Sequence, residues 1–379
     1  MLLTDVQQSI RVLAREFAER TLRPVSKTLE NGDLDTIRHV WAKLGEAGLT
    51  ALPYPEDIGG AGVDSLAYTI ALEELAKVSA GVATSFSVHS TLVGIPLLRH
   101  ASPAQVERYI PAMMEARIIG AFGLTEPNAG SDAGSCQCRA EKRGDTYVIH
   151  GSKIFITNAL TAGVFIITAR TDTNTTGAKG LSAFLVDRDT PGLTITKGDD
   201  KMGLLGSDWG ELHFDACAIP AENRLGEEGQ GFKLFMQSLD TGRISIAAIS
   251  VGLAEACLEA ARDYASQREQ FGKPLSAFQA IRFKLADMAT EIEAARCLVY
   301  NAARLKEAGQ PYGMEASMAK LYASEMVNRC ASEAVQVFGG YGYTKDFPVE
   351  RYFRDARVMS LFEGTSQIQQ LVIARHLIG

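Results

Sequence analysis

The chain has 379 residues, of which 46% are hydrophobic and 22% charged, and its net charge is -7. This length predicts two or three domains, and the composition is that of an ordinary globular protein. An acidic chain without a run of Lys or Arg is a poor match for nucleic-acid or anionic-membrane binding, and no helical stretch is expected to be apolar for long enough to span a bilayer.

The first 119 residues are predicted to be helical. Thr4 and Gln7 have the spacing of a capping box, so a helix is expected to begin almost at once. That leaves no room for a cleavable presequence and favours a bacterial-type cytoplasm. Ser102 and Gln105, with Pro103 between them, form a second predicted helix start.

From about residue 120 the pattern becomes that of strands. Residues 147–157 are expected to form two short strands around a glycine turn, followed by strands at 164–171 and 181–189. In 212–217 the alternation puts Leu212, Phe214 and Ala216 on one face and Cys217 on the other. A small β domain over 120–228 follows.

Residues 229–379 are predicted to be helical again. The stretch 244–265 is apolar almost all round, which indicates a helix buried on most sides. Ser276 and Gln279 are expected to cap the next long helix, and further helices are expected over 316–336 and 366–377. The fold class is therefore mainly α with a central β domain.

The six cysteines are scattered along the chain, which predicts free thiols in a reducing compartment and no zinc site or other metal site. The chain lacks GxxxxGK[ST], HExxH and a GxGxxG between strand and helix. Triphosphate chemistry, zinc proteolysis and a Rossmann site therefore have no signature here. A Ser/His/Asp triad stays open, although no GxSxG supports it.

The segment 122–135, FGLTEPNAGSDAGS, is rich in small and hydroxyl residues. Such a loop lets backbone N–H groups approach a flat ligand or a phosphate, and this is favoured over a plain surface turn. The segment 153–159 is by itself an ordinary strand end. Arg243 and Arg268 lie near apolar helices and need an acceptor, which a phosphate or a neighbouring acid would supply equally well.

Glu363 lies between Phe362 and Gly364, after an apolar strip and before a helix. A carboxylate beside an aromatic ring is desolvated, which raises its pKa toward the value that a general base needs. From position alone, however, a Glu that caps the following helix is favoured.

Four motifs together resemble the acyl-CoA dehydrogenase family: TEPNAGSD (125–132), REQFGKPL (268–275), QVFGGYGY (336–343) and FEGTSQIQ (362–369). The resemblance covers essentially the whole chain, and the sequence segments are most similar to those of the short-chain, butyryl-CoA branch. It implies an N-terminal α-helical domain (1–119), a middle β-barrel domain (120–228) and a C-terminal four-helix bundle (229–379). It also implies a homotetramer that binds FAD between subunits.

The implied reaction is FAD-dependent dehydrogenation of a short- or medium-chain acyl-CoA to a trans-2-enoyl-CoA, with electrons passed to electron-transferring flavoprotein. The resemblance makes Glu363 the base that takes the α-proton. Substrate contacts are implied for Ser131, Asp240, Arg243 and Gly364. FAD contacts are implied for Phe122, Leu124, Thr125, Ser131, Phe155, Thr157, Arg268, Phe271, Gln279, Gln336, Gly339, Gly340, Thr365 and Gln367.

The chain departs from the family pattern at three aromatic positions. Phe155 stands where Trp is common, and Phe122 and Phe362 stand where Tyr is common, so stacking is kept and a polar donor is lost. The floor of the acyl pocket is expected from 82–97, in which His89 is more simply a core or surface histidine. An acyl-CoA oxidase or other flavoenzyme on the same fold, and a non-catalytic helical binding module, stay open as alternatives.

Overall fold

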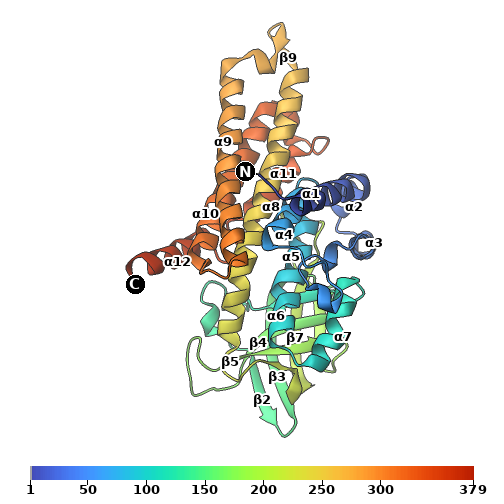
Figure 1. The fold of residues 1–379 in the computed structure, drawn as a ribbon, viewed down its shortest axis with the longest axis vertical. Helices are drawn as coiled ribbons and strands as arrows, with labels where there is room; N and C mark the ends of the chain where they lie inside the picture. Colours follow the sequence, from blue (N-terminus) through green and yellow to red (C-terminus); the bar gives the residue numbers. More distant parts are fainter. Residues whose placement is uncertain (1) are drawn as a thin grey trace.

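A computed structural model describes residues 2–379 (Figure 1). Helices form both ends of the chain, and a sheet lies between them in sequence. The first helical part packs beside the long C-terminal helices, and the sheet lies below both in Figure 1. The first part comprises α1 (Asp5–Phe17), the π segment η1 (Ala18–Leu22), α2 (Arg23–Leu29), α3 (Leu34–Glu46), α4 (Ser65–Ala76), α5 (Ala80–Ser87), the π segment η4 (Val88–Gly94), α6 (Ile95–His100) and α7 (Pro103–Met114).

Both predicted N-terminal capping boxes are confirmed. The Thr4 hydroxyl accepts from the Gln7 N–H, and the Gln7 side chain accepts from the Thr4 N–H. Ser102 and Gln105 make the same reciprocal pair at the start of α7. Each pair satisfies two backbone donors that a helix start leaves free, which is why these helices begin where the sequence predicts.

Eight strands form one sheet in the order β6-β7-β3-β2-β4-β5-β8, with β1 paired parallel to β4. Two cores lie on its two faces, one within the β domain and one against α6, α7 and the start of α8. The strands are β1 (Gly120–Gly123), β2 (Arg139–Arg143), β3 (Thr146–Thr157), β4 (Val164–Arg170), β5 (Leu181–Asp187), β6 (Leu193–Lys197), β7 (Trp209–Pro220) and β8 (Arg224–Leu225).

Two strand predictions are wrong because of irregular pairing between β3 and β7. Residues 147–157 lie in one strand, in which Gly151 (φ 136°) marks a register shift and not a turn. A Cβ at Gly151 would lie 2.8 Å from the Cα of Cys138, so the position needs glycine. Opposite this shift, Ala216 adopts φ 50°, which turns it outward and buries Cys217 on the face predicted for Ala216.

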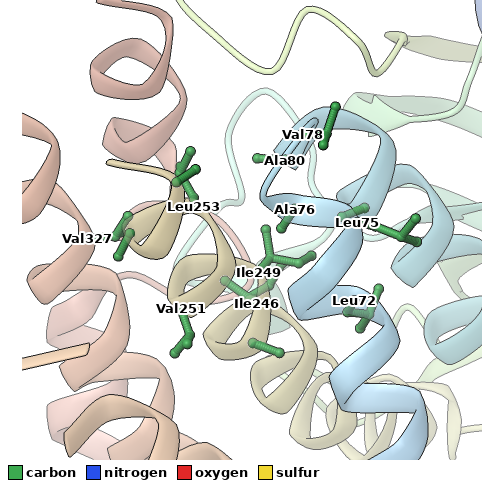
Figure 2. Packing of buried hydrophobic residues seen from close by; sticks show 14 of the residues in the cluster. Leu72, Leu75, Ala76, Val78, Ala80, Ile246, Ile249, Val251, Leu253 and Val327 are labelled. Atoms are coloured by element: carbon green, nitrogen blue, oxygen red, sulfur yellow. The ribbon is translucent and has the colours of Figure 1, made fainter. Parts of the chain in front are cut away.

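The C-terminal part is a bundle built around α8 (Gly231–Gln267). Figure 2 shows Ile246 and Ile249 of α8 against Leu72, Leu75 and Ala76 of α4, while Leu253 lies near Val327 of α10. The prediction that this helix is buried on most sides is confirmed. The bundle also contains the β9–β10 hairpin (Glu269–Gln270 and Lys273–Pro274), α9 (Gln279–Glu307), α10 (Gly313–Phe338), the 3-10 segment η8 (Gly339–Tyr343), α11 (Val349–Val358) and α12 (Ser366–Ile378).

The predicted cap at Ser276 is wrong. Residues 275–277 form a separate 3-10 turn. The extended backbone of Phe278 (φ -86°, ψ 128°) separates this turn from α9, which begins at Gln279. The Ser276 side chain is therefore one turn too early to reach the free N–H groups of α9.

The expectation about apolar helices also needs correction. Residues Ala80–His100 and Gly231–Gln267 are both long and apolar enough to cross a membrane by length and composition. Within the protein, 89% and 78% of their apolar windows are buried. Their hydrophobic surface is therefore used by the core, which a count along the sequence cannot reveal.

Candidate active site

The chain around Glu363 forms a tight left-handed turn between α11 and α12. Glu363 has φ 51° and Gly364 has φ 93°. The next residue, Thr365, is the N-cap of α12, because its hydroxyl accepts from the Ile368 N–H. Glu363 therefore does not cap the helix, and the capping alternative is wrong. A bulky residue with positive φ is uncommon and indicates a position held for a purpose.

The Glu363 carboxylate is directed into the protein. Its Oε2 atom is buried and, among residues 2–379, accepts no hydrogen bond. Gly242 of α8 lies so close that a Cβ there would overlap Oε2, and Leu92 of η4 lies 3.0 Å from the same Cβ position. Burial raises the pKa of Glu363 to about 7, while the charges of Lys320 and Arg243 oppose the rise. A carboxyl with this pKa exchanges a proton readily near neutral pH.

Two buried side chains hold the Glu363–Gly364 turn in place through hydrogen bonds. The Lys320 ammonium of α10 donates to the Gly364 carbonyl at 2.8 Å. The Gln369 amide donates to the same carbonyl at 2.8 Å and to the Glu363 carbonyl at 3.3 Å. Both side chains are fully buried. The left-handed turn is thus fixed by hydrogen bonds to its own carbonyl groups.

Arg243 follows Gly242 on α8, and the two alternatives for its acceptor both have support. Its Nη1 donates to Asp240 Oδ1 at 2.5 Å, which is the expected neighbouring acid. Its Nε is nevertheless buried without a partner within residues 2–379. Burial lowers the pKa of Arg243, which Asp240 and Glu363 oppose. One donor therefore stays available for a further acceptor.

The small-residue loop begins at the end of β1 and lies against β3. The Thr125 carbonyl accepts from the Ile154 N–H at 2.9 Å, which brings the loop beside the segment carrying Phe155 and Thr157. Phe155 is 56% exposed, has φ 59°, and stacks on Trp209 with ring centroids 5.0 Å apart. An exposed aromatic on strained backbone beside a glycine-rich loop is suited to a flat ligand.

A buried ion pair fixes the start of this loop. Lys153 Nζ lies 2.7 Å from Glu126 Oε1 and also donates to the Leu124 carbonyl. Glu126 in turn accepts from the backbone N–H groups of Gln137 and Cys138. The loop therefore leaves and rejoins the sheet at two fixed points, with Asn128 and Ser131 exposed between them.

An apolar cluster connects the Glu363 turn to the start of the loop. Leu92, which lies against Glu363 and Gly242, packs with Val88 and Leu239. Phe122 and Leu124, at the end of β1, are packed against the same cluster. The Glu363 carboxylate and the end of β1, where flavin contacts are predicted, therefore lie near the same apolar cluster.

Most of the remaining predicted cofactor residues lie away from the Glu363 turn, near the β9–β10 hairpin or the glycine turn of η8. The Arg268 guanidinium stacks over Tyr341 at 5.5 Å, beside the glycine turn of η8, and Phe271 is 94% exposed at the tip of the hairpin. Arg243 and Arg268 are the two ends of one continuous stretch of α8, about 38 Å apart at 1.5 Å per residue. Gln279 begins α9 shortly after the hairpin, Gln336 lies near the end of α10, and Gly339 and Gly340 begin η8. Thr365 and Gln367 directly follow the Glu363 turn.

Several residues of the site carried no signal in the sequence analysis. Gly242, Lys320 and Gln369 reach the Glu363 turn from different helices, and only the glycine preceding Arg243 could have attracted notice.

His89 is a core residue, as favoured: its Nε2 donates to the Met113 carbonyl and its Nδ1 accepts from the Gly120 N–H. Burial lowers its pKa to about 4, so the ring stays neutral. The six cysteines are free thiols, as predicted.

Comparison with known proteins agrees with this arrangement along the whole chain. Sequence models of the acyl-CoA dehydrogenase N-terminal, middle and C-terminal domains match residues 4–117, 121–217 and 229–378. The chain is 46% identical over 379 residues to an acyl-CoA dehydrogenase of Bacillus subtilis, covering 100% of both chains. It is 44% identical over 372 residues to a short-chain specific acyl-CoA dehydrogenase of Clostridium acetobutylicum, covering 98% of both.

The solved structure of butyryl-CoA dehydrogenase from Megasphaera elsdenii superposes with a TM-score of 0.96 at 45% identity, covering 100% of both chains. Matches of this extent, over all three domains, confirm the family and the fold class inferred from the four motifs. The chain therefore belongs to the acyl-CoA dehydrogenase family of FAD-dependent oxidoreductases.

Proposed function

We propose that this enzyme removes two hydrogens from the Cα–Cβ bond of a short- or medium-chain acyl-CoA, with Glu363 as the base. One observation carries the proposal: a buried carboxylate with no hydrogen-bond partner on Oε2 within residues 2–379, and a pKa raised to about 7, lies beside an apolar cluster that also packs against the start of the glycine-rich loop. An acyl chain bound against that cluster would present its α-carbon to the carboxylate. The name of the short-chain relatives supports the substrate class.

The chain's own groups suit the first half of the reaction. The ionised Glu363 carboxylate takes the α-proton, which is weakly acidic because negative charge spreads onto the thioester carbonyl. The backbone N–H of Glu363 donates to no backbone carbonyl among residues 2–379, so it is free to hold that oxygen. FAD, when bound, supplies the acceptor for the β-hydride. Holding base and substrate in one orientation makes the proton transfer effectively unimolecular.

FAD would be held by two chains. Phe122, Leu124, Thr125, Ser131, Phe155 and Thr157 would hold its flavin side, and Arg268, Phe271 and Gln279, with Gln336, Gly339 and Gly340, the other. Arg268 lies about 38 Å along the helix from Arg243, which follows Gly242 beside the Glu363 carboxylate. This separation within one chain supports a cofactor shared between two chains. The exposed apolar side chains near the hairpin and on the projecting α12 support the same assembly, a homotetramer: Phe271, Tyr343, Leu371, Leu377 and Ile378 (Figure 1).

Arg268→Ala is expected to weaken FAD binding and subunit assembly together, because this cation would bridge one subunit to the cofactor of the next. FAD content after gel filtration and the mass of the assembly by light scattering measure both. Arg262→Ala is the matched control, since Arg262 is an exposed arginine of the same helix whose ion pair within residues 2–379 is with neighbouring Asp263. A variant that stays tetrameric with full FAD content would contradict the bridging role.

The proposed function is tested by mixing the oxidised enzyme anaerobically with a panel of acyl-CoAs of increasing length and following the loss of flavin absorbance. Rapid loss of flavin absorbance with short-chain acyl-CoAs is the expected result. If no acyl-CoA reduces the flavin, the proposed function is wrong. Admitting air then separates a dehydrogenase, whose reduced product complex persists, from an oxidase. A colourless protein that takes up no FAD would favour the binding module. Electron-transferring flavoprotein is the proposed acceptor and the cytoplasm the proposed location.

A further inference from the structure

The Glu363 turn is a costly arrangement that the fold maintains. Both Glu363 and Gly364 have positive φ, which is a strained backbone conformation for the glutamate. Its carboxylate is also desolvated and makes no hydrogen bond through Oε2. Both features destabilise the folded chain, so neighbouring groups must stabilise the turn by more than the strain and the desolvation cost.

Lys320 is the group whose placement is hardest to explain by packing. Its side chain is fully buried in α10, where an ammonium loses its hydration and needs compensation. Its Nζ has one hydrogen-bond partner within residues 2–379, the Gly364 carbonyl at 2.8 Å. Burial lowers the pKa of Lys320 to about 8, which the charge of Glu363 opposes. A methionine of similar length would fill the same volume without that cost.

Gln369 separates the effect of the hydrogen bond from the effect of the charge. Its amide donates to the same Gly364 carbonyl and to the Glu363 carbonyl, and it is neutral. The turn is therefore held by two donors, only one of which carries charge. Replacing each donor in turn therefore separates the loss of a hydrogen bond from the loss of a charge.

The charges that face Glu363 come from several elements. Lys320 of α10 has the largest effect of a neighbouring charge and lowers its pKa, and Arg243 of α8 acts in the same direction. Tyr68 of α4 is a buried neutral phenol whose pKa is raised above its ordinary value. Further out, Asp240 pairs with Arg243, and Glu325 accepts from Ser366. After burial, the charge of Lys320 thus has the largest effect on the pKa of Glu363, and it favours the ionised carboxylate.

We propose that Lys320 is a positioning residue: its buried ammonium fixes the Glu363–Gly364 turn by donating to the Gly364 carbonyl, and its positive charge favours the ionised Glu363 carboxylate. The proposal rests on the proposed function for its kinetic consequences. Its electrostatic part concerns the chain alone and does not depend on which acyl-CoA is oxidised.

The kinetic test compares Lys320→Met, which removes both donor and charge, with Gln369→Leu, which removes a neutral donor. For the wild type, kcat/KM is expected to rise with pH through about 7, where Glu363 ionises. Lys320→Met is expected to move that rise to higher pH by about one unit, which lowers the ionised fraction of Glu363, and with it kcat/KM at pH 7, by roughly fivefold. Gln369→Leu is expected to lower kcat without moving the pH profile.

Lys284→Met is the control, because Lys284 is a half-exposed lysine of α9 paired with Glu333. An unchanged pH profile in Lys320→Met would overturn the proposal. So would a loss of activity that is explained entirely by loss of FAD or of the assembly, since that is the signature of a purely structural lysine. If Lys320→Met does not fold, Lys320→Gln keeps a donor without the charge and is expected to show the same pH shift.

A second readout needs no activity. The pKa of Glu363 is higher in the folded chain, about 7, than in the unfolded chain, about 4.5. The free energy of unfolding therefore falls as the pH rises from about 4.5 to 7, and this loss of stability stays constant at higher pH. Glu363→Gln removes this loss. The stability difference between chains with and without the Glu363→Gln substitution should therefore level off near pH 7 when Lys320 is present. In the Lys320→Met background it should keep growing to higher pH. An identical pH dependence in both backgrounds would refute the electrostatic role even if no acyl-CoA were a substrate.

Discussion

Glu363→Gln is expected to abolish reduction of bound FAD by acyl-CoA while leaving FAD content unchanged. The amide has the size of the carboxyl group and cannot accept the α-proton, so the rate should fall by at least about 10³-fold, within the range that general bases contribute. The carboxylate lies against Gly242 and Leu92, and exchanging oxygen for nitrogen adds no heavy atom there. The rate is measured by stopped-flow absorbance of the flavin under anaerobic conditions.

The control for this variant is Glu315→Gln, because Glu315 lies on the first turn of α10 and belongs to the same bundle. It removes one negative charge without touching the turn at 363, and bleaching should proceed at the wild-type rate. Normal reduction in Glu363→Gln would move the base to another residue and end the proposed mechanism. Loss of FAD in the same variant would show that Glu363 supports the cofactor instead.

Gly242→Ala is the second substitution expected to have a large effect. A Cβ at 242 would overlap Glu363 Oε2, and Leu92 closes the other side of that methyl group at 3.0 Å. The carboxylate must therefore move, and displacement of a reacting group by about 1 Å costs on the order of 10²-fold in rate. We expect kcat to fall by about that factor, with KM changed much less.

Stability separates this effect from general damage to α8. Alanine is favoured over glycine within a helix by about 1 kcal/mol, which offsets part of the steric cost, so the thermal midpoint should change little. Gln237→Ala, at an exposed position of the same helix, is the control and should keep full activity. Wild-type kcat in Gly242→Ala would show that the carboxylate has room to move and that the close contact has no kinetic role.

Much of the fold could be predicted because its signals are local. Capping boxes at Thr4 and Ser102 depend on residues three apart, and the burial of α8 follows from its own composition. The errors lie where local pattern is overruled by pairing. Ala216 alternates correctly in sequence, but a register shift against β3 turns it outward. Ser276 has the spacing of a cap, but the extended Phe278 ends the 3-10 turn before the helix begins.

In the candidate site, too, the local features could be predicted and the contacts between distant segments could not. Glu363 and its left-handed turn lie within one motif, so the base could be proposed from a short stretch of sequence. Its surroundings come from chain segments far away: Gly242 from α8, Leu92 from η4 and Lys320 from α10. A lysine inside an apolar helix gives no indication of which carbonyl it meets. Those contacts are set by how four helices pack, and a single sequence carries no record of that.

The π segment η4 has a consequence for the packing next to Glu363. Residues 88–94 wind wider than an α-helix, so one residue more is accommodated per turn there, and both ring nitrogens of His89 tie this stretch to the ends of α7 and β1. Because the wider turn holds one extra residue, deleting a residue within 88–94 would restore regular winding while the flanking helices α5 and α6 keep their places. The side chains inside the segment would then point in new directions, and Leu92 would lose its place beside Gly242. The packing next to Glu363 therefore depends on the one residue by which η4 exceeds a regular helix.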